Sequence, residues 1–197
     1  MNIVMKKWIL WGGLVLVLLM IFSVVIEQYN SLVKLDESVK TQWGQVESVY
    51  QRRADLIPNI VATVKKEANF EQETLKQVVE ARASATQLNV RADNAQDFAK
   101  FQAAQWELSQ ALGKLLMLTE NYPTLQSNKA FSDLRVQLEG AENRIAVERM
   151  NYNTAVQAYN TEMRSFPISL VAKSFWFEKA NLFEANKGAE VAPVVEF

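Results

Sequence analysis

The residues of this sequence that could do chemistry are an arginine on an apolar helix face and the acids that could pair with it. Arg53 occupies the one slot in a helically spaced apolar stripe where another apolar residue is expected. A buried arginine needs a carboxylate or backbone carbonyls, because burying its charge unpaired is prohibitive. We interpret it as part of a structural ion pair that fixes helix register, with a ligand or partner site as the alternative. The predicted polar cluster comprises Arg53, Asp55, Glu120, Glu139 and Glu142.

A proline stands inside the same stripe. Pro58 would cost a helix interior about 3 kcal/mol and would free the carbonyl one turn earlier. The stretch is therefore either a kinked helix or a junction between two helices. In the second case Asp55 is the N-cap and Pro58 lies in the first turn.

The composition excludes most other catalytic chemistry. The sequence has no cysteine and no histidine, which removes thiol nucleophiles, disulfides, histidine acid–base catalysis and metal sites built on these ligands. A hydrolase using paired carboxylates is the enzyme class left, but the acids mostly stand at spacings typical of a solvated helix face. We predict no catalytic residue, cofactor or metal, and assign no small-molecule ligand. The weakly acidic balance after residue 26 also argues against nucleic-acid binding.

Residues 8–26 form an uncharged apolar run that is long enough to cross a bilayer core of about 30 Å as a helix. A signal peptide is the alternative, but the run exceeds a usual signal core and no small-residue cleavage pattern follows it. We predict an uncleaved signal anchor. Lys6 and Lys7 flank it closely on one side, which places the N-terminus in the cytoplasm and the bulk of the chain outside.

Residues 27–166 have a nearly continuous helical pattern, which predicts an all-α bundle of long helices. No glycine or proline intervenes between Phe22 and Trp43, so the membrane helix can continue into the bundle as one rod. A second helix is expected over about residues 70–88, with Asn69 in a capping box.

Asp93 or Asn94 can cap a third helix, which ends at Asn121–Thr124 because a residue before proline is pushed out of the helical region. The last long helix is expected to begin after Ser127 or Asn128. Its sustained 3–4 spacing predicts bundle or coiled-coil packing. The positions expected to face inward are Phe131, Leu134, Leu138, Ala141, Ile145, Tyr152, Ala155, Tyr159 and Phe166.

A short repeat lies within this helix. Tyr152-Asn153-Thr154 recurs seven residues later as Tyr159-Asn160-Thr161, so both tyrosines face the same way. We interpret them as core residues whose hydroxyls are satisfied at the rim, and a paired aromatic ligand clamp is the alternative.

Two surfaces could serve assembly or membrane contact. One is the glycine pair Gly12-Gly13, flanked by Trp8 and Trp11, where helices could approach closely in lipid. The other lies in an aromatic C-terminal segment, residues 167–186, beyond Pro167. Its candidate residues are Phe175, Trp176, Phe177, Leu182 and Phe183. The expected organisation is a basic flank at 1–7, an anchor at 8–26, a bundle at 27–166, the aromatic segment at 167–186 and a flexible tail at 187–197.

The chain resembles the LemA family of bacterial membrane proteins. The motifs that carry the resemblance are Tyr29-Asn30-x-Leu32-Val33, Trp43, Gln51–Asn59, Glu120–Pro123, Glu142–Ile145, Arg149-x-x-Tyr152-Asn153, Tyr159-Asn160 and Phe166-Pro167. They run in order along nearly the whole chain. The resemblance implies one membrane segment and an antiparallel bundle of long helices, and it supplies no enzyme activity or cofactor.

Three functions compete on this basis. A non-enzymatic, membrane-anchored scaffold or assembly protein of the bacterial envelope, self-associating or binding other envelope proteins, fits one anchor and a bundle. A sensory or ligand-binding bundle would need a separate signalling or protease partner, because the chain shows no transmitter domain. A carboxylate-only hydrolase is the third and least favoured.

Overall fold

The computed structural model describes residues 3–67, 70–87 and 94–184, with no side-chain detail for residues 3–7, 9 and 10. These residues form helices and no strand. The elements are α1 (Ile3–Val64), α2 (Gln72–Thr86), α3 (Ala95–Thr119), α4 (Pro123–Gln126), α5 (Lys129–Arg164) and α6 (Ile168–Ser174). The all-α fold is therefore as predicted. The expected tail, residues 187–197, lies outside the described residues.

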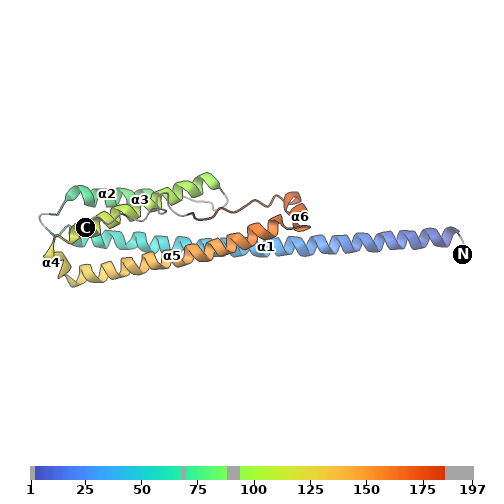
Figure 1. The fold of residues 1–197 in the computed structure, drawn as a ribbon, viewed down its shortest axis with the longest axis horizontal. Helices are drawn as coiled ribbons and strands as arrows, with labels where there is room; N and C mark the ends of the chain where they lie inside the picture. Colours follow the sequence, from blue (N-terminus) through green and yellow to red (C-terminus); the bar gives the residue numbers. More distant parts are fainter. Residues whose placement is uncertain (1–2, 68–69, 88–93, 185–197) are drawn as a thin grey trace, which may run out of the picture.

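The long helix α1 has two halves with different surroundings. Its N-terminal half extends alone beyond the bundle, and its C-terminal half lies alongside α5, which runs in the opposite direction (Figure 1). Residues 11–22 are exposed, and this part of α1 is long and apolar enough to cross a membrane. From Leu32 onward, one face of the same helix is buried against the bundle. One rod thus joins the apolar segment to the bundle core.

Pro58 does not interrupt α1, so the junction alternative with Asp55 as N-cap is wrong. The freed carbonyl has a partner from outside the helix. Because Pro58 has no N–H, the carbonyl of Ala54 has no intrahelical donor four residues ahead. Arg82 of α2 donates its Nε–H to that carbonyl at 2.8 Å. The proline thereby leaves an acceptor on α1 at which α2 docks.

The loops and caps follow local sequence signals in most places. Asn94 caps α3 by accepting from the backbone N–H groups of Gln96 and Asp97, and Asn128 caps α5 by accepting from that of Phe131. The N-cap of α2 is Glu71, without a side-chain bond, and the predicted cap Asn69 lies outside the described residues.

In the last long helix the helical pattern fails at one predicted core position. Phe166 is 83% exposed, because α5 ends at Arg164 and the helical periodicity no longer applies two residues later.

The core consists of two apolar clusters placed one after the other along the bundle. The cluster nearer the exposed half of α1 contains Trp43, Tyr50, Phe98, Phe101, Ile145, Tyr152 and Phe183. The other contains Ile57, Leu108, Leu112, Leu115, Phe131 and Leu138. Each of α1, α3 and α5 contributes to both clusters, so each carries residues at the boundary between them.

Candidate functional site

A polar layer lies at the boundary between the two apolar clusters. Arg53 of α1, Gln105 of α3 and Glu142 of α5 each stand between an apolar residue of one cluster and an apolar residue of the other. The helical repeat of 3.6 residues explains this position, because the flanking core residues lie three or four positions away on each helix. The sequence thus inserts one polar level into a bundle that is otherwise apolar.

Arg53 is the centre of this layer and is only 1% exposed. Its Nη1 donates to Glu142 Oε1 at 2.7 Å and to Ser109 Oγ at 2.8 Å. Its Nη2 donates to the side-chain oxygen of Gln105 and, at 3.4 Å, to the Gln105 carbonyl. The amide of Gln105 in turn donates to the carbonyl of Ala85 at 3.2 Å. Side chains from α1, α3 and α5 and a carbonyl of α2 are therefore joined in one network.

The carboxylate of this network is only partly withdrawn from water. The Glu142 side chain is 42% exposed, whereas its partner is buried. The pair therefore sits at the bundle rim, where water lowers the desolvation cost of the acid. Within the part of the chain that the structure describes, Nη1 and Nη2 of Arg53 have hydrogen-bond acceptors and Nε has none.

The other three acids of the predicted cluster lie elsewhere. Asp55 accepts from Gln51 Nε2 at 2.8 Å on the exposed face of α1. Glu139 faces Arg135 of its own helix at 3.6 Å, and both side chains are exposed. Glu120 is the C-cap residue of α3. None of the three contacts Arg53 in the described network.

Sequence reasoning missed Gln105 and Ser109, which accept three of the arginine's four hydrogen bonds. A signal for Gln105 was present, because it interrupts the apolar spacing of Phe101 and Leu108 as Arg53 interrupts that of α1. Ser109 lies one turn further on, and its hydroxyl also donates to the Gln105 carbonyl at 3.1 Å.

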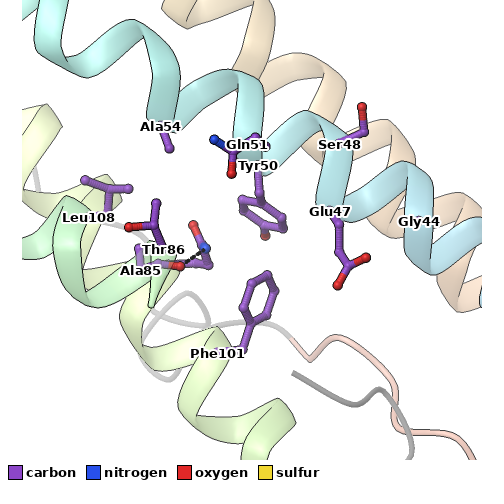
Figure 2. A pocket seen from close by; sticks show the side chains of 11 residues that line it. Gly44, Glu47, Ser48, Tyr50, Gln51, Ala54, Ala85, Thr86, Phe101 and Leu108 are labelled. Carbon is purple, nitrogen blue, oxygen red and sulfur yellow. Dashed lines mark hydrogen bonds between the residues drawn. The ribbon is translucent and has the colours of Figure 1, made fainter. Parts of the chain in front are cut away.

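Two cavities border the polar layer. One of about 380 Å³ lies between α1, α2 and α3, and Figure 2 shows Tyr50 and Phe101 pointing toward one another in it. Their ring centroids are 5.1 Å apart in an edge-to-face arrangement. Burial raises the pKa of the Tyr50 hydroxyl above its ordinary value.

The second cavity, about 260 Å³, is lined by Arg53, Glu142, Arg149 and Trp106 among others. Its charged groups suit a small polar molecule. The described residues contain no group of three or more acids that could hold a metal ion.

The Tyr-Asn repeat of α5 holds the chain's own C-terminal segment. Tyr159 donates to the carbonyl of Glu178 and Tyr152 to that of Asn181, both at 2.9 Å. Asn160 binds both the N–H and the carbonyl of Ala180, at 3.1 and 2.9 Å. Asn153 binds both groups of Phe183, each at 2.9 Å. We call residues 178–183 the strap.

Helix geometry explains the spacing of these bonds. Seven residues of helix rise about 10.5 Å, and three residues of extended chain span about 10 Å. The repeat on α5 therefore matches every third residue of the strap. The hydroxyls of both tyrosines have hydrogen-bond partners at the rim of the core, as predicted. These partners are backbone carbonyls of the strap.

The candidate contact residues divide between core and surface. Phe183 is buried among Trp43, Phe98 and Tyr152, and Phe177 is half-buried. Phe175, Trp176 and Leu182 are exposed, as are Trp8 and Trp11 on the lone half of α1. A Cβ added to Gly12 or Gly13 would meet nothing within 4 Å, so both glycines are open for contact with another molecule.

Comparison with known proteins places this architecture in a family. Magnetosome protein MamQ 2 of Paramagnetospirillum magneticum is 24% identical over 88% of this chain and 70% of its own length. Magnetosome protein MamQ of Magnetospirillum gryphiswaldense is 23% identical over 92% and 73%. Protein LemA of Metamycoplasma hominis is 19% identical over 84% and 73%. The LemA family profile matches residues 42–197. This match covers most of the bundle, the polar layer and the strap, and the chain therefore belongs to the LemA family.

Proposed function

We propose that this protein is a non-enzymatic scaffold or assembly protein of the bacterial cell envelope, anchored by one helix and self-associating. The observation that carries the proposal is α1, one helix whose exposed apolar half continues into the core of the bundle. Such a rod fixes the distance of the bundle from a membrane. That arrangement suits a protein whose task is to present binding surfaces in fixed positions.

Two further observations support this function. The sequence lacks the histidine and cysteine that most catalytic sites use. Two of the relatives are named as magnetosome proteins, which supports a role in a cell structure. Other envelope proteins are candidate partners besides a second copy.

The proposed location is the inner membrane, with the N-terminus in the cytoplasm and the bundle in the periplasm or outside. Lys6 and Lys7 support this orientation through the positive-inside rule. Because the chain has no cysteine, single cysteines introduced as Lys7→Cys and Ala189→Cys report topology without background. An impermeant thiol reagent applied to intact spheroplasts should label position 189 and leave position 7 unlabelled. The reverse pattern contradicts the orientation.

The mass of the full chain in mild detergent tests the scaffold proposal, together with crosslinking in native membranes and identification of co-purifying proteins. We expect a multiple of the chain mass or a stable complex with envelope proteins. A monomer without crosslinked species contradicts the proposal.

A ligand-binding bundle is the second candidate, and the cavities beside Arg53 favour it. A small polar molecule in the 260 Å³ cavity could reach Arg149 and Trp106 and displace the strap residue Phe183, which also lines it. Mass spectrometry of the natively purified protein under non-denaturing conditions would show such a molecule as a mass increment. The increment should disappear in the Arg149→Ala variant.

A further inference from the structure

Four large apolar side chains are exposed at the end of the bundle nearest the lone half of α1. Phe166 precedes α6, Leu170 lies within it, and Phe175 and Trp176 follow it. Their exposed fractions are 83%, 60%, 49% and 87%. We call these four exposed residues the collar. A single exposed residue of this kind is ordinary, whereas four on one short stretch mark an interaction surface.

The collar lies where α1 leaves the bundle. α6 packs against α1 and α5 at the end of the bundle nearest the lone half of α1 (Figure 1). The ring of Phe175 lies 4.9 Å from that of Tyr29, and the half-buried Phe177 ring lies 5.8 Å from it. Tyr29 is three residues beyond Ile26, the last residue of the apolar run, which is about 4.5 Å along a helix. The collar is therefore level with the exit of α1 from its apolar segment.

The backbone around Trp176 keeps its side chain at the surface. The Phe177 N–H donates to the carbonyl of Ala172 at 3.0 Å, which closes the C-terminus of α6. Trp176 takes the left-handed conformation inside this closure, with φ of 54°, at a position where glycine is common. A glycine would serve the turn better, so the turn alone does not account for a large aromatic residue here.

The residue types fit the layer between lipid tails and water. Tryptophan is enriched at both edges of a membrane, where its ring is apolar and its N–H reaches the headgroups. Lys173 and Lys179 are exposed on either side of Phe175 and Trp176, and their long side chains can reach phosphates while their stems lie along apolar surface. Glu27 and Glu178 are exposed nearby, so the charge is mixed and the apolar side chains dominate the contact.

We propose that the collar lies in the interfacial layer of the same bilayer that α1 crosses, so that the bundle is held to the membrane at two points. This inference rests on the proposed anchoring of α1. The second contact would fix the tilt of the bundle against the lipid surface, which one helix cannot do alone. A second copy of the chain covering the collar is the competing occupant and is an outcome of the test below.

Spin labels on single cysteines test the collar in the full chain reconstituted into phosphatidylcholine vesicles. The variants are Trp176→Cys and Leu170→Cys, with Val17→Cys on the lone half of α1 and Val136→Cys on exposed α5 as controls. Oxygen concentrates in lipid and a neutral nickel chelate in water. Relaxation by the two reagents therefore reports which phase each label contacts. Helicity measured by circular dichroism confirms that each labelled variant is folded.

We expect the oxygen-to-nickel ratio at positions 170 and 176 to be several-fold higher than at 136 and to approach that at 17. A ratio at 170 and 176 equal to that at 136, with 17 in lipid, overturns the collar and leaves the anchor standing. Low access to both reagents at 176 means a protein contact and also overturns it. A water-like ratio at 17 contradicts the anchor itself, and the collar proposal falls with it.

Discussion

At the scale of single residues, the stability of the bundle depends on how well the Arg53 charge is matched. We predict that Arg53→Ala lowers the free energy of unfolding by about 3–5 kcal/mol, because it leaves a cavity in the core and deprives the buried Gln105 oxygen of its donor. Arg53→Met should cost less, because methionine refills the space. Chemical denaturation of the full chain in detergent measures both differences.

The neighbouring Arg52 is exposed and provides the matched control. Arg52→Ala should change the free energy of unfolding by no more than about 0.5 kcal/mol. Equal costs for Arg52→Ala and Arg53→Ala would mean that the polar layer contributes nothing specific.

The stability of the folded chain at alkaline pH should depend on Tyr159, which binds the strap. Burial raises the pKa of its hydroxyl to about 12, from the ordinary value of 10. The folded state therefore favours the protonated form. This contribution is fully present below pH 10 and is lost as the pH rises toward 12. Tyr159→Phe should lower stability by about 1 kcal/mol at neutral pH, through the lost bond to the Glu178 carbonyl.

The same variant should lose less stability than the wild type between pH 10 and 12. Melting curves of both proteins at a series of pH values measure the difference, in which the titration of the other tyrosines and lysines cancels. Parallel pH profiles would show that Tyr159 titrates normally.

The polar layer shows how far the sequence predicts single residues. Arg53 was identifiable because it breaks an apolar stripe, and Gln105 breaks its own stripe in the same way. The sequence did not identify Glu142 in preference to Glu120 and Glu139, because that choice depends on the relative heights of α1 and α5. That offset is set by packing along the whole helix pair, and no local pattern encodes it.

At the scale of elements, Pro58 of α1 and Arg82 of α2 act together where α2 packs against α1. Arg82→Ala should cost about 1 kcal/mol, because it leaves the Ala54 carbonyl without its donor. In a Pro58→Ala background the restored N–H at position 58 can bond that carbonyl, so the cost should shrink. A double-mutant cycle on the free energy of unfolding should therefore give a coupling of about 0.5–1 kcal/mol.

Lys76 on the exposed face of α2 is the control for this cycle. Lys76→Ala should have the same small effect in both backgrounds. A coupling of zero for Arg82→Ala would show that the Ala54 carbonyl is satisfied by water when the arginine is absent.

The strap is held to α5 by main-chain bonds, so its attachment should depend on the two asparagines. We predict that Asn153→Ala with Asn160→Ala releases it, because four of its hydrogen bonds are lost together. At about 1 kcal/mol a bond, amide exchange at positions 180 and 183 should accelerate by at least roughly tenfold. Hydrogen–deuterium exchange with mass spectrometry measures it.

Gln157 is exposed on the same helix and provides the control. Gln157→Ala should leave exchange in the strap unchanged. Unchanged exchange in the asparagine double variant would mean that the buried ring of Phe183 holds the strap without the four asparagine hydrogen bonds.

The elements differ in how well local sequence predicted them. Asn94 was one of two predicted caps and Asn128 one of two predicted positions before a helix start, because a cap bonds to groups two or three residues away. The strap was not predicted, because its partners are 19 to 30 residues distant and lie on a face that looked like ordinary core. The seven-residue spacing of the Tyr-Asn repeat was visible in the sequence. The strap that it binds is an extended segment without a regular sequence pattern.

At the scale of the whole molecule, α1 determines what the bundle can do. Because the helix is continuous from the apolar run into the core, a contact made by its lone half is transmitted as a fixed orientation of the bundle. The lone half is exposed on all sides between residues 11 and 22, so in a bilayer it meets either lipid or another copy. The glycines near its start are where another helix could approach most closely.

Self-association through this half predicts different effects for Gly12→Leu and Gly13→Leu. Adjacent helical residues point about 100° apart, so a partner helix would pack more closely against one glycine than against the other. One substitution should therefore lower the oligomer mass in mild detergent, and the other should leave it unchanged. Val17→Leu adds a methylene to an exposed position of the same helix and should have no effect. If neither glycine variant changes the mass of an oligomeric wild type, the association lies in the bundle, and the anchor serves only to hold it at the membrane.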